Sequence, residues 1–372
     1  MRLSVISSTV LFLSLCVLAA CTKPPEVIGI DNPDKPAASV VGTKRHQIFI
    51  ATSRQACNCE GEGELFSGQR ATSLSLAGVT VSIPPGHTPG EVERTRTLPP
   101  DPSQHFMVPD AETFQSDQQF IAAINAELAT RAPSNRDVLL FVHGFNNTLT
   151  DSILRVAQFV EDSGFKGVPV LFSWTSAGQI SRYVYDINST LAARPLLEEA
   201  SVLLSQTNAT GFDVLAHSMG TLLVVEVMVQ SDLQSTLGGS GKLKNIMLAA
   251  PDIDVDVFRS QLGQIKRDPG NIYVFISQDD RALNLSRRIS GGVDRVGDAS
   301  ISELSGLGVT VVDLSNVQDF ESSAHSKFSG SPEAVQLIGD SLRENGYDRG
   351  QDVTIFADPS QILPGIADAF RE

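Results

Sequence analysis

Along most of the chain, segments with two different patterns of apolar and polar residues follow one another in turn. Short runs that are almost entirely apolar, such as residues 138–142 (VLLFV) and 212–216 (FDVLA), are typical of strands buried on both faces of a sheet. Between such runs lie stretches with apolar residues three and four apart, which is the spacing of amphipathic helices. The remaining segments of these two kinds are strands at 168–174, 245–249, 272–276 and 309–314, and helices at 151–162, 191–205, 221–230, 255–265, 282–289 and 332–345.

This alternation of strands and helices predicts an α/β protein with a mainly parallel, doubly wound sheet. Ahead of it, the pattern predicts two more strands, at 46–51 and 79–83, a Pro- and Gly-rich loop at 84–109, and a helix at 117–131. We therefore expect a single domain over residues 46–345. No role is assigned to the tail, residues 346–372.

The first residues have the pattern of a bacterial signal peptide. Arg2 precedes an apolar stretch, and residues 1–20 end in small side chains directly before Cys21. The sequence LAAC at residues 18–21 matches a lipobox, in which the Cys21 thiol is acylated, as by palmitate, and Cys21 becomes the new N-terminus. The alternatives are a cleaved signal with an incidental cysteine, or an uncleaved anchor helix.

The next segment, residues 21–45, is rich in Pro, Asp and Lys and predicts a flexible tether between lipid and domain. Thr22, rather than Asp, follows the cysteine, which favours sorting to an outer membrane. We expect a lipoprotein of the bacterial cell envelope whose lipid anchor holds it to the outer membrane, with the domain facing the periplasm.

Charge and cysteine content exclude several classes of partner. The net charge is -15 and no basic run occurs, so nucleic acid is not an expected partner. After Cys21 only Cys57 and Cys59 remain, and two thiols are too few to hold a metal ion. No metal and no cofactor is predicted, and the pair is interpreted as structural or incidental. The sequence does not indicate an oligomeric state.

One segment has the pattern of a serine nucleophile. Residues 212–220 (FDVLAHSMG) place Ser218 between a buried-type strand and an apolar helix, with Ala216 two residues before it and Gly220 two residues after. A nucleophile elbow needs this layout, because small residues at those positions allow a tight turn that projects the hydroxyl into a pocket. The alternative interpretation is a serine that caps a core helix.

A serine nucleophile needs a base, and His325 is the only histidine that follows Ser218 in the chain. It lies in the loop after the last predicted strand, before the last helix, where this type of sheet places its base. The alternative is a histidine in a surface loop.

The acid that orients the base should follow a strand between these two residues. Residues 277–281 (SQDDR) follow the strand at 272–276, and we expect Asp280 to be the acid, with Asp279 in reserve. Asp252 and Asp254, after the preceding strand, offer a second position. An aspartate directly after a strand is also a common helix cap.

An oxyanion hole needs two backbone N–H groups aimed at the developing charge. We expect one from Met219, directly after the nucleophile, and one from Phe145, in the loop after the strand at 138–142. Four further residues are candidates for the lining of the pocket: His143, Gly144, Trp174 and His217. We expect His143 and His217 to be structural or to form part of the pocket wall rather than to act as the base.

Six motifs follow one another along the chain: HGFNN from His143, FSW from Phe172, AHSMG from Ala216, AAPDID from Ala249, DRAL from Asp280 and AHS from Ala324. Together they resemble a bacterial α/β-hydrolase family of unknown function in the esterase/lipase superfamily, over roughly residues 47–328. The resemblance implies the α/β-hydrolase fold, hydrolysis without a named substrate, and Ser218, Asp280 and His325 as the triad. Thr175 stands where Pro is typical and Ala324 where Gly is typical, which bears on pocket shape.

The sequence therefore predicts a serine hydrolase that cleaves carboxylic esters, esterase- or lipase-like, through an acyl-enzyme. The expected substrate is a small-molecule ester or a lipid. Two alternatives remain open: a non-catalytic envelope lipoprotein that uses the fold as a binding scaffold, and a peptidase or thioesterase of the same fold. Residues 177–194 are the expected place for a lid.

Overall fold

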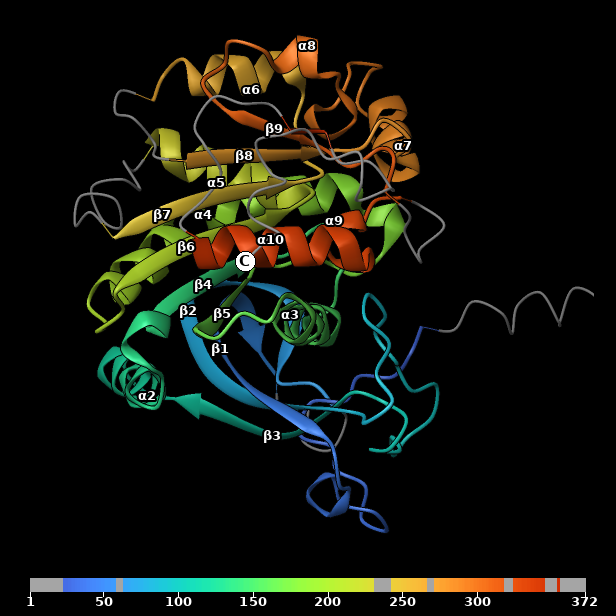
Figure 1. Ribbon diagram of the computed structural model, residues 1–372, viewed down its shortest axis with the longest axis vertical. Helices are drawn as coiled ribbons and strands as arrows, with labels where there is room; N and C mark the ends of the chain where they lie inside the picture. The colour runs from blue at the N-terminus through green and yellow to red at the C-terminus, as the bar shows by residue number, and fades with distance from the viewer. Residues whose placement is uncertain are drawn as a thin grey trace, which may run out of the picture.

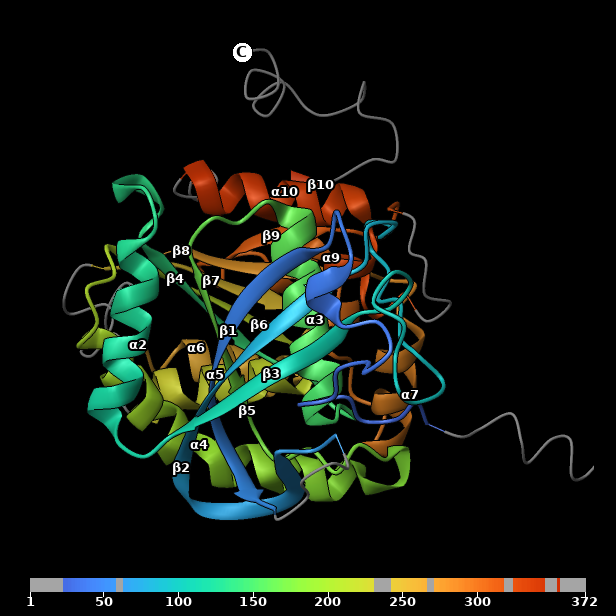
Figure 2. The same ribbon diagram turned by 90° about the horizontal axis from the view of Figure 1, so that it is seen from below.

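The described strands form one sheet with helices on both faces (Figures 1 and 2). The computed structural model describes residues 23–57, 63–230, 242–265, 271–317, 324–344 and 353–354. The predicted signal peptide, Cys21, Cys59 and nearly all of the predicted tail lie outside these residues. Cys57 is disulfide-bonded.

The strand order across the sheet is β10-β9-β8-β7-β6-β4-β5-β1-β2-β3. All described pairs from β10 to β1 are parallel, whereas β1–β2 and β2–β3 are antiparallel. This confirms the mainly parallel, doubly wound sheet that the sequence pattern predicts. The strands are β1 (Lys44–Ala56), β2 (Phe66–Ile83), β3 (Met107–Phe114), β4 (Asp137–Val142), β5 (Val168–Ser173), β6 (Gly211–His217), β7 (Leu243–Ala249), β8 (Asn271–Ile276), β9 (Thr310–Asp313) and β10 (Val353–Thr354).

Helices cover the sheet in two groups. α3, α9 and α10 lie on one face, and α2, α4, α5 and α6 lie on the other (Figure 1). Every residue of β4 and β5 is buried, because both faces of these central strands are covered. The helices are α2 (Asp117–Ala129), α3 (Leu149–Ser163), α4 (Tyr183–Ser205), α5 (Met219–Gln230), α6 (Val255–Leu262), α7 (Arg281–Ile289), α8 (Ile301–Leu304), α9 (Lys327–Gly330) and α10 (Pro332–Glu344).

Two elements differ from the sequence prediction. Residues 107–109 of the predicted loop at 84–109 belong to β3, an edge strand whose second half is exposed and lacks an apolar run. Helix α4 begins at Tyr183 rather than near residue 191. The pattern does not predict its first two turns, because they bury the polar side chains of Asp186 and Ser189 and expose the apolar Val184. Both elements are held by tertiary contacts that local patterning does not report.

The N-terminal segment also differs from the predicted flexible tether. Val27 and Ile28 are 1% and 5% exposed, and Ile28 forms a parallel bridge with Val108 of β3. The Gly29 N–H donates to the Val108 carbonyl over 2.8 Å. From residue 23 onward, this segment therefore packs along the edge of the domain. Among the described residues, no helix has the length and apolar content needed to cross a membrane.

Candidate active site

Ser218 occupies a tight turn between β6 and α5. Its φ is 53°, in the left-handed region that a serine rarely adopts. The Ser218 N–H donates to the carbonyl of Ala249 on β7 over 2.9 Å, and the Ser218 carbonyl accepts from Thr221 N–H over 3.0 Å. A Cβ on Gly220 would lie 2.4 Å from the His143 carbonyl oxygen, so only glycine fits two residues after the serine. These contacts produce the nucleophile-elbow geometry.

His325 lies between Ser218 and Asp280. Its Nε2 is 2.9 Å from Ser218 Oγ, and its Nδ1 is 2.7 Å from Asp280 Oδ2. Because an ionised carboxylate only accepts, Nδ1 carries the proton and Nε2 is left to accept from the serine hydroxyl. The structure thus brings together the three residues that the sequence predicts, although they are far apart in the chain.

Asp280 is held by the helix that it caps. Its side chain is fully buried, and Oδ1 accepts from the N–H groups of Ala282 and Leu283, each over 2.9 Å. These bonds begin α7 and leave Oδ2 aimed at His325. The carboxylate therefore both caps a helix and faces the base.

The other candidate acids make different contacts. The Asp279 side chain is 57% exposed and accepts from Lys327 Nζ over 2.8 Å. Asp252 accepts from the Tyr183 hydroxyl over 2.9 Å, and Asp254 caps α6. In the described structure, Asp280 is the carboxylate bonded to His325.

Strained backbone gathers around this site. The described non-glycine residues with positive φ are Asn146, Ser218, Ala250 and Ala324. Three of them follow strands at the carboxyl edge of the sheet, and Ala324 directly precedes His325. Such backbone persists where neighbouring structure fixes it, and it clusters at functional sites. Ala324 has a φ of 58°, which accounts physically for glycine being typical there in the family that the sequence resembles.

The loop after β4 passes directly over Ser218. A Cβ on Gly144 would lie 2.9 Å from Ser218 Cβ and 2.8 Å from His217 Nδ1. The Asn147 side-chain amide donates to the Gly144 and Phe145 carbonyls over 3.2 and 2.8 Å. Since a trans peptide points its N–H opposite to its C=O, the Phe145 N–H is directed away from Asn147.

Arg54, on β1, is hydrogen-bonded to this loop. It is 2% exposed, and it donates to the Asn147 carbonyl, to the Ser176 carbonyl and to Ser173 Oγ over 2.9, 3.0 and 2.9 Å. Burial lowers the pKa of Arg54 to about 10, so the side chain stays charged at neutral pH. Sequence reasoning missed Arg54 and Asn147, because Arg54 lies among polar residues in the second half of β1 and no local pattern marks it as buried.

The two other histidines at the site are neutral. Burial, followed by the charge of Arg54, lowers the pKa of His143 to about 3. The His143 ring stacks on Trp174, its nitrogens lie 2.9 and 3.0 Å from the Gly144 and Trp174 carbonyls, and Trp174 Nε1 donates to the His143 carbonyl. Trp174 is fully buried in the core rather than on a pocket wall.

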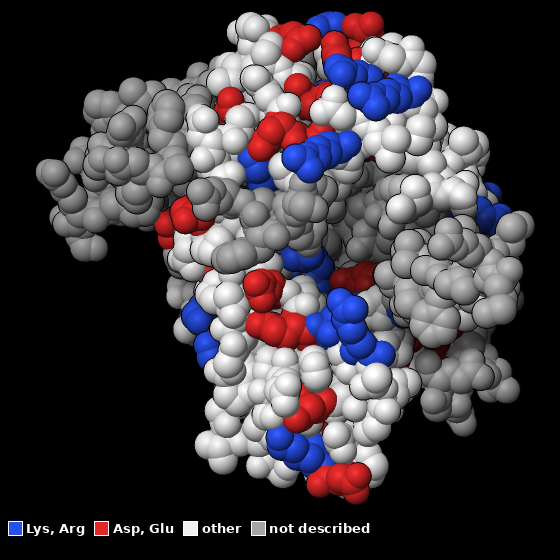
Figure 3. Space-filling view, turned by 90° about the vertical axis from the view of Figure 1, so that its right-hand side faces the viewer, with Lys and Arg blue, Asp and Glu red and all other residues white. Residues whose placement is uncertain are grey.

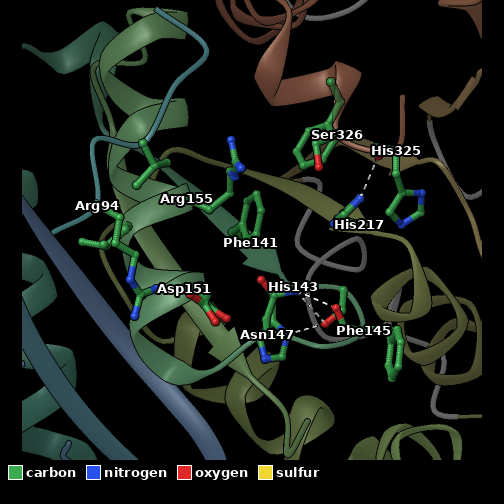
Figure 4. Close-up of a pocket in the computed structure, with 15 residues that line it drawn as sticks. Arg94, Phe141, His143, Phe145, Asn147, Asp151, Arg155, His217, His325 and Ser326 are labelled. Carbon is green, nitrogen blue, oxygen red and sulfur yellow. Dashed lines mark hydrogen bonds and ion pairs between the residues drawn. The ribbon is translucent and has the colours of Figure 1, made fainter. Parts of the chain in front are cut away.

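His217 contacts the backbone of His325. Burial, followed by the neighbouring His325, lowers the pKa of His217 well below 6.5. Its Nε2 lies 3.2 Å from the His325 carbonyl oxygen, and the two rings are 4.8 Å apart (Figure 4). His217 therefore fixes the backbone position of His325.

A cavity of about 310 Å³ adjoins His325 (Figure 4). Phe145 and His325 line one side, Arg94 and Arg155 line the other, and Gly144 also contributes to the lining. Arg94 is paired with Asp151, also in the wall. Met219 is 1% exposed and belongs to the core. In the part of the chain that the structure describes, no three His, Cys, Asp or Glu side chains are grouped as metal ligands.

This geometry agrees with a comparison of the sequence with known families. A family model described as "Alpha/beta hydrolase of unknown function (DUF900)" matches residues 117–341. The chain belongs to this family. Membership confirms the α/β-hydrolase fold and the family resemblance seen in the sequence motifs. A search of curated proteins found no match.

Solved structures similar to this hydrolase include esterases and a lipase. An esterase of Pyrobaculum calidifontis is 13% identical over 57% of this chain and 78% of that chain, with a TM-score of 0.33. Lipase B of Aspergillus fumigatus is 13% identical over 68% and 61%, with a TM-score of 0.36. The thermophilic carboxylesterase EstE1, from a metagenomic library, is 13% identical over 62% and 97%, with a TM-score of 0.35. We draw no functional conclusion from similarity at this level.

Proposed function

We propose that the protein is a serine hydrolase that cleaves carboxylic esters through an acyl-enzyme. The observation that supports this most strongly is the position of His325, whose two ring nitrogens lie 2.9 Å from Ser218 Oγ and 2.7 Å from Asp280 Oδ2. A serine becomes a nucleophile at neutral pH when a positioned base accepts its proton. A chain of nucleophile, base and buried acid meets this requirement.

The proposed reaction has two halves. Ser218 Oγ attacks the ester carbonyl carbon while His325 Nε2 takes the hydroxyl proton, and the Asp280 carboxylate stabilises the resulting imidazolium. The tetrahedral intermediate collapses, the bond to the alcohol breaks, and His325 returns its proton to the leaving oxygen. Water, activated by His325, then cleaves the acyl-enzyme and releases the acid.

The oxyanion is proposed to bind the Met219 and Phe145 N–H groups. Met219 begins α5, so its N–H is among those that a helix leaves without an intrahelical partner. The bonds from Asn147 to the Gly144 and Phe145 carbonyls favour a Phe145 N–H that points toward the serine side of the loop. The carbonyl oxygen gains charge in the transition state, and donors fixed in advance stabilise it there.

Two other functions remain testable against this proposal. A peptidase or thioesterase would use the same three residues on a different acyl derivative. A non-catalytic scaffold has no need of a buried carboxylate, an imidazole and a serine in hydrogen-bonding sequence. The geometry therefore favours an enzyme, and the leaving group decides between the enzymatic alternatives.

We further propose that the chain is lipidated at Cys21 and anchored at the outer membrane, with the domain in the periplasm. The lipobox sequence at residues 18–21 supports this. Metabolic labelling with palmitate, comparing the natural chain with Cys21→Ala, tests lipidation; equal labelling of both would rule it out.

Fluorophosphonate labelling tests the enzymatic proposal on the chain without residues 1–21. We expect the wild type to be labelled, and Ser218→Ala and His325→Ala to lose labelling while their circular dichroism stays unchanged. Ser290→Ala, which removes the serine of another Ser-x-Gly sequence, is the matched control and should be labelled like the wild type. A folded wild type that takes no label would favour the scaffold.

A further inference from the structure

Four apolar side chains are exposed on two neighbouring segments of the fold. Ile180 lies in the 3₁₀ turn η4 (Ile180–Arg182) and Val184 in the first turn of α4, and they are 66% and 65% exposed. Leu285 and Ile289 lie one turn apart on α7 and are 49% and 51% exposed. Large apolar side chains that are exposed together on one surface often mark an interaction site, whereas singly exposed ones are common on any protein.

The two segments contact each other and the proposed active site. The Tyr183 hydroxyl is 2.7 Å from Ser286 Oγ, so the start of α4 is bonded to α7. The Tyr183 ring also packs edge-on against Phe145 of the loop over Ser218, with centroids 5.2 Å apart. We name the surface formed by Ile180, Val184, Leu285 and Ile289 the apolar edge.

Basic side chains accompany the apolar edge. Arg182, Arg281 and Arg288 are exposed, and Arg281 precedes Leu285 by one helical turn. Figure 3 views this side and shows basic side chains next to acidic ones, without one large patch of a single sign. Exposed apolar side chains flanked by arginines fit a bilayer interface, where apolar groups enter the acyl region and cations meet lipid phosphates.

The described chain begins beside the same edge. The Lys23 ammonium lies 3.1 Å from the position that a Cβ on Gly178 would take, two residues before Ile180. Arg94 fixes this start by donating to the Pro25 carbonyl over 3.0 Å. Figures 1 and 2 both show α7 and the start of the described chain on one side of the molecule.

The chain between the proposed anchor and Lys23 is short. Cys21 precedes Lys23 by two residues, and two residues span at most about 7 Å. An acyl chain on Cys21 would therefore bring the membrane surface to the apolar edge rather than to the opposite edge of the sheet.

We propose that the apolar edge docks on the lipid bilayer and that the active site takes its substrate from it, an acyl ester of a glycerolipid. The proposal rests on the proposed hydrolase function and, for the anchored protein, on lipidation of Cys21. Docking places Phe145 and the cavity beside the interface, so that an ester bond at headgroup depth reaches Ser218 without the lipid leaving the membrane.

Docking is tested without catalysis, by co-sedimentation of the chain from Thr22 onward carrying Ser218→Ala. The probes are vesicles of phosphatidylcholine and phosphatidylglycerol in equal parts. Replacing the four residues of the apolar edge by serine should weaken binding by more than about tenfold. Val41→Ser is the matched control. Val41 is 93% exposed but lies just before β1, where the amino ends of the parallel strands meet, whereas the apolar edge lies near their carboxyl ends. Equal sedimentation of all three chains would overturn the proposal.

Substrate delivery is tested with Ser218 intact, as the ratio of two activities. The first is hydrolysis of a diacylglycerol carried in the same vesicles, and the second is hydrolysis of a short, water-soluble p-nitrophenyl ester. The fourfold serine variant should lower this ratio by about tenfold, whereas an unchanged ratio would refute delivery from the bilayer. A wild type that cleaves neither ester would refute the hydrolase function, while sedimentation would still decide on docking.

Discussion

The guanidinium Nη2 of Arg54 donates a hydrogen bond to the backbone carbonyl of Asn147 across 2.9 Å. Asn147 in turn donates to the Gly144 and Phe145 carbonyls. A buried cation on β1 therefore sets the orientation of the loop proposed to bind the oxyanion. In the proposed mechanism Arg54 touches no reacting atom and acts as a positioning residue.

Arg54→Lys should lower kcat by about 10²-fold with a nearly unchanged KM, because a single ammonium cannot reach all three acceptors and the loop shifts. Ester hydrolysis under conditions where the variant is fully folded measures this. Arg70→Lys is the matched control, since Arg70 is opposite Arg54 on β2 and also bonds a serine hydroxyl and a backbone carbonyl, but both of these partners, Ser189 and Tyr185, belong to α4. A loss of activity that only follows the unfolded fraction would assign Arg54 a purely structural role.

Asp280→Asn should reduce kcat by roughly 10³–10⁴-fold, because an amide in this position no longer selects the tautomer with the proton on Nδ1. The neighbouring change Asp279→Asn should leave kcat within a few-fold of the wild type, since Asp279 bonds Lys327 and is largely exposed. Steady-state kinetics of both variants decide the matter. Comparable losses in the two would show that the observed bond to His325 does not define the acid.

Gly144→Ala should slow both ester hydrolysis and fluorophosphonate labelling by about 10²-fold, because the new methyl group would meet His217 and Ser218 at less than 3.0 Å. The loop must move to accommodate it, and the proposed oxyanion donors move with it. Gly86→Ala serves as the control, because nothing lies within 4 Å of its added Cβ. Unchanged labelling of the Gly144 variant would contradict the assignment of this loop.

Asp213→Asn should stabilise the protein more as pH rises. Burial raises the pKa of Asp213 from an ordinary 3.8 to about 7, although a hydrogen bond from Asn245 opposes this. Between these two values the folded protein holds a proton that the unfolded chain has lost, so the wild type loses stability as pH increases. The amide does not titrate. Urea unfolding should show a gain of about 1–3 kcal/mol for the variant at pH 8, and little gain at pH 4.

A gain that is the same at both pH values would mean that Asp213 does not titrate between them. Asn245→Ala provides a second check, because it removes the neutral donor to Asp213 Oδ1. It should destabilise the protein at both pH values.

The parts of the fold that the sequence predicts are those with strong local patterns. Strands β4 and β6, the second of which leads to Ser218, are buried along nearly their whole length. A strand that is covered on both faces needs a nearly continuous apolar run, and the sequence shows such runs directly. The grouping of Ser218, Asp280 and His325 could be predicted from chain order, because the carboxyl ends of parallel strands meet at one edge.

The parts that were missed depend on partners distant in sequence. β3 carries polar residues on its exposed half and exists through pairing with β2, with Leu76 opposite Phe114. Arg54 is a buried cation, and two of its three acceptors are backbone carbonyls, which carry no sequence signature. Val27 and Ile28 belong to a short apolar stretch inside a segment rich in Pro, Asp and Lys, and so short a stretch does not distinguish a packed edge from a tether.

The packed N-terminal segment also sets where the protein can be shortened. A soluble version trimmed to the predicted domain start at residue 46 would uncover Val108 and would lack the Pro25 carbonyl that accepts from Arg94. Arg94 forms an ion pair with Asp151, and both side chains line the active-site cavity. Such a version would be less stable and would have an altered cavity wall, and low activity in it would say little about the natural enzyme. Trimming after Cys21 removes the proposed lipid attachment and leaves every described contact in place.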